Sequence, residues 1–294
     1  ALVVFWLALI HGQRPELIKL NRGVMLPGGD RPRNRRALLV YYSLTGNGRA
    51  AIDQVRSGLR EAGYRCRDCV VVPTERERYT FPFRSLGHLV RTLVEALLRR
   101  SAQVELHIDP PAAELDSSAD PQLDSRDSAG DHDLVVCLSQ TWMLGISAPI
   151  QGLFEHPDGP ALFAGRDVAV VNVCRGLWRR SQAQLTAAVA ASGGRVIATS
   201  PHSNPGREPM RLFSLFAFLA LGPQRWPHRL EGRFLTPQRL AEPDRARLRQ
   251  LGHQLAGRPR PGQAEPSADS DSTCAGDSAS DTDSAADGAR EDMT

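Results

Sequence analysis

The sequence predicts an α/β protein built around a doubly wound, five-stranded parallel sheet with helices on both faces. Short apolar segments with the pattern of buried strands alternate with segments whose apolar residues recur at helical spacing. This alternation is typical of parallel sheets, because the helix after each strand crosses over a face of the sheet. At 294 residues the chain is long enough to bury a large core.

The first strand–helix–strand unit has the clearest pattern. Residues 37–42 (ALLVYY) form a continuous apolar run, as expected of a parallel strand buried on both faces. Residues 49–62 follow with apolar side chains at helical spacing, and Gly63 is expected to end that helix. A second strand is expected over residues 66–72, before Pro73.

The same alternation resumes in the second half of the chain. The expected strands are 134–139, 167–173 and 195–200, and the expected helices are 149–156, 181–191 and one near 237–257. Residues 85–100 have the spacing of an additional amphipathic helix. The apolar segment 209–222 either packs as core or lines a channel for an alkyl chain.

Composition divides the chain into three parts. Residues 1–34 are interpreted as an N-terminal extension outside the fold, whose opening run of ten apolar residues is shorter than the ~20 that a membrane-spanning helix needs. Residues 35–257 are expected to form the domain, with insertions at 73–132 and 201–235. Residues 258–294 are expected to be a disordered acidic tail.

Charge is distributed unevenly along the chain. Segment 264–294 carries nine acidic residues and one arginine, so its −8 within a total of +3 leaves +11 on the rest. No basic run is interleaved with aromatic residues, so no nucleic-acid partner is expected. A basic body also suits an acidic partner protein or an anionic membrane surface, but peripheral membrane contact is the less favoured interpretation.

The cysteines predict a reducing compartment, such as the cytoplasm. Their number, five, is odd and small for the length of the chain, which argues against a disulfide framework. Cys66 and Cys69 have CxxC spacing, but on a strand residues three apart point to opposite faces. They are therefore not expected to form a redox pair or to bind a metal, and no metal site is predicted.

Three loops follow the carboxyl ends of predicted strands, where open α/β sheets bind their ligands. They are 43–48, 140–148 and 174–180. The first supplies hydroxyl groups and backbone N–H groups directly before a helix, which favours a bound phosphate. It has neither the GxGxxG of dinucleotide-binding proteins nor the GxxxxGK of a P-loop.

Two stretches of sequence resemble the flavodoxin family. "YYSLTGNG" resembles the S/T-x-T-G-N phosphate loop of flavodoxins, and "DLVVCLSQTWMLGISAPIQGLF" resembles their third strand and the loop after it. The resemblance covers roughly residues 37–200 and implies the strand order 2-1-3-4-5 and FMN as cofactor. With "TFPF" and "VNVCRGLW", the chain most resembles the flavodoxin-like dialkylresorcinol condensing enzymes.

The resemblance also implies which residues surround the cofactor. They are Ser43, Thr45, Gly46, Asn47 and Gly48 at the phosphate, Thr141 and Trp142 beside the ring, and Cys174, Arg175 and Gly176 in the third loop. Trp142 is alternatively a packing residue under its loop. Where flavodoxin loops usually close with Ser or Thr, this chain has Gly48 and Arg49, and Arg49 either binds the phosphate or lies exposed.

The leading functional hypothesis is an FMN-dependent oxidoreductase that acts on a small apolar cyclic or quinone-like substrate, with NAD(P)H as a candidate electron donor. The resemblance implies an oxidising or aromatising step in dialkylresorcinol or aryl-polyene biosynthesis. Two alternatives remain: an electron carrier that meets a redox or pathway partner protein, and a flavin-free binding or scaffold protein. Nothing in the sequence supplies the activated Cys with His or Asn partners that a Claisen condensation needs, and no catalytic residue is assigned.

Overall fold

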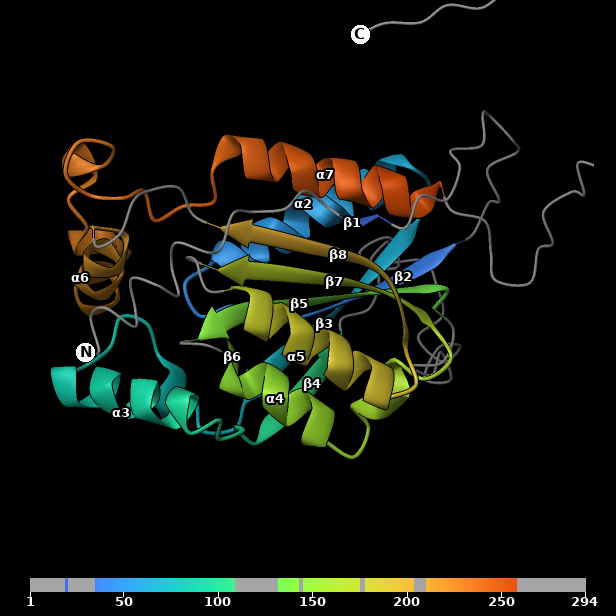
Figure 1. Cartoon of the computed structure of the whole chain (residues 1–294), viewed down its shortest axis with the longest axis horizontal. Helices are drawn as coiled ribbons and strands as arrows, with labels where there is room; N and C mark the ends of the chain where they lie inside the picture. Colours follow the sequence, from blue (N-terminus) through green and yellow to red (C-terminus); the bar gives the residue numbers. More distant parts are fainter. Residues whose placement is uncertain are drawn as a thin grey trace, which may run out of the picture. The chain divides into compact units, whose positions relative to one another are not determined.

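The computed structural model describes residues 19–20, 35–108, 132–142, 145–174, 178–203 and 210–257. Figure 1 shows a twisted sheet with helices on both of its faces. The strands are β1 (Lys19–Leu20), β2 (Arg36–Tyr41), β3 (Arg65–Pro73), β4 (Val104–Ile108), β5 (Leu134–Trp142), β6 (Gly145–Ile146), β7 (Asp167–Cys174) and β8 (Arg195–Ser203).

The strand order confirms the predicted fold class. The sheet runs β1-β8-β7-β5-β2-β3-β4, and β6 pairs with β5 off this path. Strands β3, β2, β5, β7 and β8 are parallel to their neighbours, whereas β1 and β4 add antiparallel edges. Numbered along the chain, the parallel strands have the order 2-1-3-4-5, which is that of a flavodoxin-like doubly wound sheet.

The helices fall into three groups (Figure 1). Helices α2 (Asn47–Glu61) and α7 (Glu242–Ala256) cover one face of the sheet, and α4 (Ala148–Glu155) and α5 (Trp178–Ala191) cover the other. Helices α3 (Leu86–Leu97) and α6 (Met210–Arg225) lie beyond the carboxyl ends of β7 and β8. Short 3₁₀ turns are η1 (Arg76–Tyr79), η3 (Pro160–Leu162) and η4 (His228–Leu230). Among the described helices, none has the length and apolar character needed to cross a bilayer.

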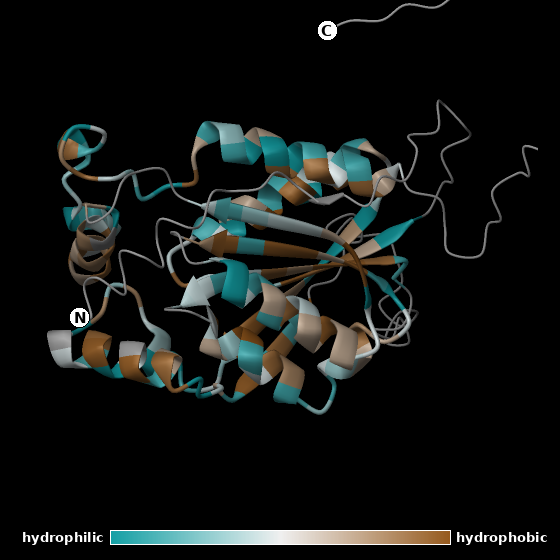
Figure 2. Cartoon of the chain, in the orientation of Figure 1, coloured by the Kyte–Doolittle hydropathy of each residue, from teal (hydrophilic) through white to brown (hydrophobic). Residues whose placement is uncertain are grey.

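Each face of the sheet carries its own core, as the alternating side chains of a strand require. Leu39 of β2 and Leu248 of α7 belong to the core under α2 and α7. Leu38 of β2 and Leu185 of α5 belong to the core on the opposite face. Figure 2 shows predominantly apolar strands between helices that carry both hydrophilic and hydrophobic residues. A third, smaller cluster joins α3 to α6 through Phe83, Leu89 and Leu219.

The predicted alternation of the two CxxC cysteines is seen in these cores. Cys66 is buried in the core under α2 and α7, whereas Cys69 is buried in the core on the other face. The two thiols therefore face opposite sides of β3, and no group of three or more His, Cys, Asp or Glu side chains within the described residues could hold a metal ion.

The structure corrects three sequence-based boundaries and adds a strand that was not predicted. Strand β5 continues to Trp142, because Thr141 and Trp142 pair with β6. These two residues therefore lie on a strand rather than in a loop. Strand β4 was not predicted in the first insertion; it pairs with the edge of β3. Helix α5 begins at Trp178 rather than at 181, and α7 begins at Glu242, next to a proline in its first turn, rather than at 237.

In the region 1–34, Lys19 and Leu20 pair with β8. The predicted tail, 258–294, lies outside the described residues.

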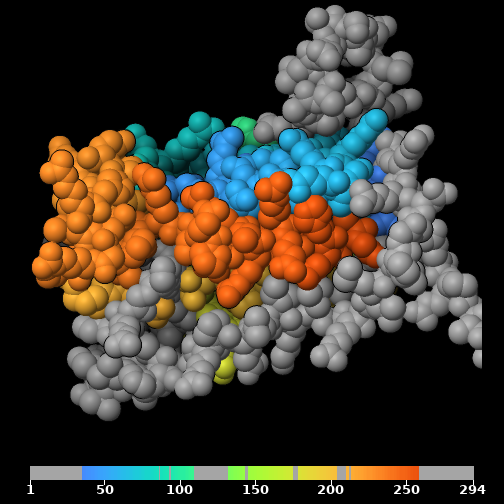
Figure 3. Space-filling view, turned by 90° about the horizontal axis from the view of Figure 1, so that it is seen from above, coloured from blue at the N-terminus to red at the C-terminus, as the bar shows by residue number. Residues whose placement is uncertain are grey.

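Helices α2 and α7 pack unusually closely, and Figure 3 shows them side by side. A Cβ atom added at Gly58 would lie 2.0 Å from the carbonyl oxygen of Arg249, and one added at Gly252 would lie 2.5 Å from that of Val55. At the rim of this contact, Glu61 accepts hydrogen bonds from Arg249 and from His253 Nε2, the latter at 2.9 Å. The backbone contact thus requires residues without side chains at both glycine positions.

We expect Gly58→Ala to destabilise the protein by about 2 kcal/mol or more, although alanine is the better helix former, because its methyl group meets backbone that cannot move aside. Gly87→Ala in α3 is the matched control: its methyl group would meet only Ser85 Oγ, at 3.9 Å, so this variant should be as stable as the parent or more so. Urea unfolding measures both. Equal stability of the two variants would contradict the close helix contact.

Candidate functional site

The first loop at the carboxyl edge is a short turn between a buried strand and a helix. Strand β2 ends at Tyr41, and α2 begins at Asn47. Gly46 has φ +83°, a left-handed conformation that favours glycine, and it directs the chain into the helix. Ser43 Oγ accepts a hydrogen bond from the backbone N–H of Arg49 at 3.1 Å, which closes the turn.

The start of α2 has the properties of an anion-binding site. The N-cap residue, Gly46, has no side chain to cap the helix, and Ser43 is the side chain that accepts an N–H of the first turn. Within the described part of the chain, the N–H groups of Asn47 and Gly48 have no hydrogen-bond partner, whereas that of Ala50 donates to the carbonyl of Gly46. These free donors stand at the positive end of the dipole of a 15-residue helix.

The loop is tight on one side and open on the other. A Cβ atom added at Gly48 would lie 2.9 Å from the carbonyl oxygen of Tyr42, so the helix starts in contact with the residue that follows β2. A Cβ atom added at Gly46 would meet nothing within 4 Å. Thr45 directly precedes Gly46 and is partly exposed. The open side therefore has room for a group that the N–H donors can bind.

Two other segments hold the loop in place. Asn47 Nδ2 donates to the carbonyl of Gln238 at 2.7 Å, so the segment that leads into α7 supports the turn. The N–H of Leu44 lies 3.4 Å from Gln140 Oε1, at the end of β5. The structure thus brings together the first and second of the predicted loops. The contact with Gln238 could not be predicted, because it joins residues far apart in the sequence.

An aromatic cluster lies beside this loop. The ring of Trp142 is 5.9 Å from that of Tyr42, in an edge-to-face arrangement, and 5.9 Å from that of Tyr79, with the two planes tilted by 30°. Tyr42 and Tyr79 were not predicted as site residues, although Tyr42 is part of the quoted loop motif. The hydroxyl of Tyr42 is buried and finds no partner among the described residues, and burial raises the pKa of this phenol. The indole of Trp142 remains partly exposed.

The third loop is only partly described. Thr141 Oγ1 donates to Asn172 Oδ1 at 2.9 Å, which links the ends of β5 and β7. Cys174, the last residue of β7, is 3% exposed. Arg175 and Gly176 lie outside the described residues, so their predicted positions are not tested.

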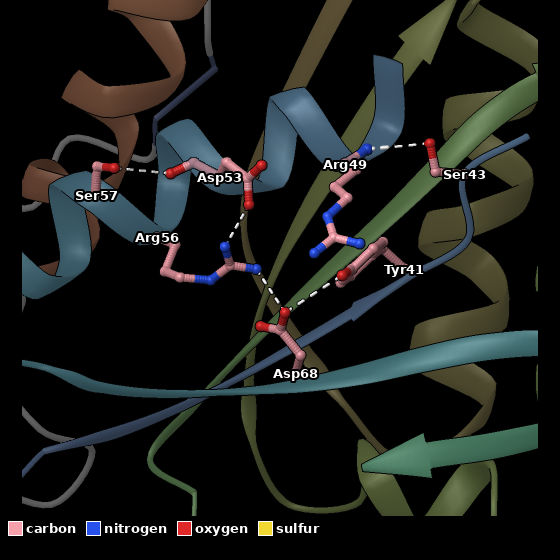
Figure 4. Close-up of polar contacts among 7 residues, drawn as sticks. All are labelled: Tyr41, Ser43, Arg49, Asp53, Arg56, Ser57 and Asp68. Atoms are coloured by element: carbon pink, nitrogen blue, oxygen red, sulfur yellow. Dashed lines mark hydrogen bonds and ion pairs between the residues drawn. The ribbon is translucent and has the colours of Figure 1, made fainter. Parts of the chain in front are cut away.

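Arg49 does not turn toward the open side of the loop. Figure 4 shows its guanidinium directed toward the phenol of Tyr41, on the side of the sheet covered by α2. Tyr41 donates to Asp68 Oδ2 at 3.2 Å, and the same oxygen accepts from Arg56 at 2.6 Å. Arg56 also bonds to Asp53, one turn earlier in α2. These contacts fix the first half of α2 to β3.

Burial and the Asp68 carboxylate raise the pKa of Tyr41 to about 12, and this shift predicts a pH dependence. An unfolded tyrosine has a pKa of about 10, so the stabilisation is fully present below about pH 10 and is lost as the pH rises toward 12. The protein should therefore lose more stability between about pH 9 and about pH 11 than a Tyr41→Phe variant, measured by urea unfolding. A parallel decline in both proteins would show that Tyr41 does not carry the effect.

A second polar group ties α7 to the sheet. Ser200 Oγ lies 2.8 Å from His202 Nε2, and His202 Nδ1 lies 3.3 Å from Asp244 Oδ1 in the first turn of α7. The order of the three groups is that of a hydrolase triad. However, Ser200 and His202 are only 1% and 3% exposed, so neither can meet a substrate. These contacts position α7 rather than perform chemistry.

Comparison with known proteins assigns this chain to no family. No protein-family model and no curated protein matches the sequence. Solved structures that resemble the chain include a flavoprotein in complex with FMN from Lactobacillus acidophilus, with 14% identity, a TM-score of 0.40, and 57% of this chain and 93% of that one covered. A flavodoxin from the domain Archaea has 10% identity, a TM-score of 0.38 and coverage of 75% and 96%. Flavodoxin 1 from Bacillus cereus has 12% identity, a TM-score of 0.37 and coverage of 74% and 94%. The roles of residues in this chain therefore rest on its own geometry.

Proposed function

We propose that this chain binds FMN at the carboxyl edge of its sheet and is an FMN-dependent oxidoreductase. The observation that carries the proposal is the loop from Ser43 to Gly48, which presents unpaired N–H donors at the start of a long helix. A terminal phosphate is the group that such a turn binds best. The aromatic cluster beside it gives a planar ring a surface on which to stack.

The residues present fit this cofactor. The left-handed turn at Gly46 leaves space above the helix, and Ser43 and Thr45 add hydroxyl groups around it. In this proposal Ser43, Thr45, Gly46, Asn47 and Gly48 hold the phosphate, and Thr141 and Trp142 border the ring, with Cys174, Arg175 and Gly176 at the third loop. The bound flavin would supply the redox chemistry, and the protein would supply placement and the exclusion of water.

Apolar side chains next to the loop favour a substrate that is itself apolar. Leu44, in the middle of the loop, packs against both the core beside Trp142 and the cluster between α3 and α6. That cluster also contains Phe81, Phe83 and Phe216. We therefore propose a small cyclic or quinone-like substrate of low polarity. The finer assignment, an oxidising or aromatising step in dialkylresorcinol or aryl-polyene biosynthesis in the cytoplasm, rests on the sequence alone.

The phosphate loop predicts a preference for FMN over riboflavin. Without its phosphate, the ligand keeps the ring contacts but loses those to α2, so we expect riboflavin to bind at least about 100-fold more weakly. Thr45→Val should reduce FMN affinity about tenfold and leave riboflavin affinity unchanged. Quenching of flavin fluorescence measures both. Thr186→Val, the same change in the middle of α5, is the control and should alter neither affinity.

A protein that is colourless when purified and that binds FMN no better than riboflavin would remove the basis of this proposal. If FMN binds, stopped-flow mixing with NAD(P)H distinguishes an enzyme from an electron carrier. Direct reduction of the flavin, followed by turnover with a quinone, supports the oxidoreductase. Reduction only through a separate reductase supports the carrier that the sequence left as an alternative.

A further inference from the structure

Helix α3 exposes an apolar face that is unusual for a surface helix. Val90, Val94, Leu97 and Leu98 are 51%, 46%, 56% and 61% exposed. Their spacing of four, three and one residues places them along one side of the helix. A surface helix normally presents charged and polar residues to water, and contiguous exposed apolar side chains indicate a surface that something else covers.

The exposed face is distinct from the one that packs on the protein. Leu89 and Thr92 are 4% and 6% exposed, and Leu89 packs with Phe83 and Leu219 between α3 and α6. At about 100° per residue, these inward residues lie roughly opposite to Val94. The helix is therefore apolar on two sides, and its inner side alone suffices to attach it to the domain.

Arginines flank the exposed face in the sequence: Arg84, whose guanidinium lies 3.8 Å from Glu77, precedes the helix, and two arginines follow it. Residues 84–100 contain four arginines and one glutamate, Glu95, which pairs with Arg91 at 3.0 Å. Arg99 and Arg100, directly after the helix, are exposed. An occupant of this surface must therefore provide both apolar contact and negative charge.

We propose that α3 docks on an anionic lipid bilayer, with its apolar side chains in the interface and its arginines at the headgroups. A second copy of the chain would meet the same face and so set arginines against arginines. The acidic segments 109–131 and 264–294 have the charge but hold only Leu115, Leu123 and Met293 as large apolar residues, and residues 1–10 are apolar but carry no charged side chain. A bilayer with anionic lipids supplies both properties, as it does for other interfacial amphipathic helices.

The experiment is sedimentation of the full chain with vesicles of phosphatidylcholine, with and without about 30% phosphatidylglycerol. We expect binding to the anionic vesicles only, with weakening at high salt. Arg99→Glu/Arg100→Glu should reduce binding about tenfold or more. Val94→Asp/Leu97→Asp should also reduce it strongly, because apolar contact is lost.

Matched controls separate docking from a change in net charge. Arg60→Glu/Arg65→Glu makes the same charge change at exposed positions of α2 and β3, and Ala187→Asp/Ala190→Asp adds two aspartates at the same spacing on exposed positions of α5. Both should bind like the parent. Absence of binding to anionic vesicles, equal losses in the controls, or self-association that Val94→Asp/Leu97→Asp abolishes would each overturn the proposal. FMN is not needed in any of these measurements, so the result is independent of the proposed function.

Discussion

The structure depends on the burial of one strand on both of its faces. In β2, Ala37, Leu38, Leu39 and Val40 are fully buried, and the strand pairs with β3 on one side and β5 on the other. Its alternating side chains belong to the two large cores. A shift of the strand by one residue would therefore move every side chain from one core into the other. The loop that follows is therefore fixed in space, and the start of α2 keeps its orientation although its N-cap residue, Gly46, has no side chain.

The parts of the fold that the sequence predicted are those with strong local patterns. Runs such as 134–139 and 167–173 consist mostly of β-branched and other apolar residues, and the predicted ends lie within three residues of the observed ones. Strand β4 was missed because Val104–Ile108 alternates with polar residues, and only its pairing with β3 makes it a strand. The polar residues Gln140 and Thr141 likewise join β5 because β6 and β7 supply partners for their backbone.

In the candidate site, too, only the residues that belong to a local sequence pattern could be predicted. Ser43 to Gly48 could be identified because the motif, its strand and its helix are contiguous in sequence. Tyr79 and Gln238 could not, since they reach the site only through the insertion after β3 and the segment before α7. The direction of the Arg49 side chain, toward Tyr41, could not be predicted either, because no local pattern in the sequence indicates it.

The supports of the loop also link ligand binding to the packing of α7. Gln238, which accepts from Asn47, precedes α7, and that helix is held by Gly252 against α2 and by Asp244 against His202. A ligand that requires the ordered loop binds the folded state alone, so it stabilises every one of these contacts together, by RT ln(1 + [L]/Kd). A mutation that loosens the packing of α7 should in turn lower the affinity for the ligand, because the linkage is reciprocal. The close glycine contact between α2 and α7, although distant from the loop, is in this sense part of the site.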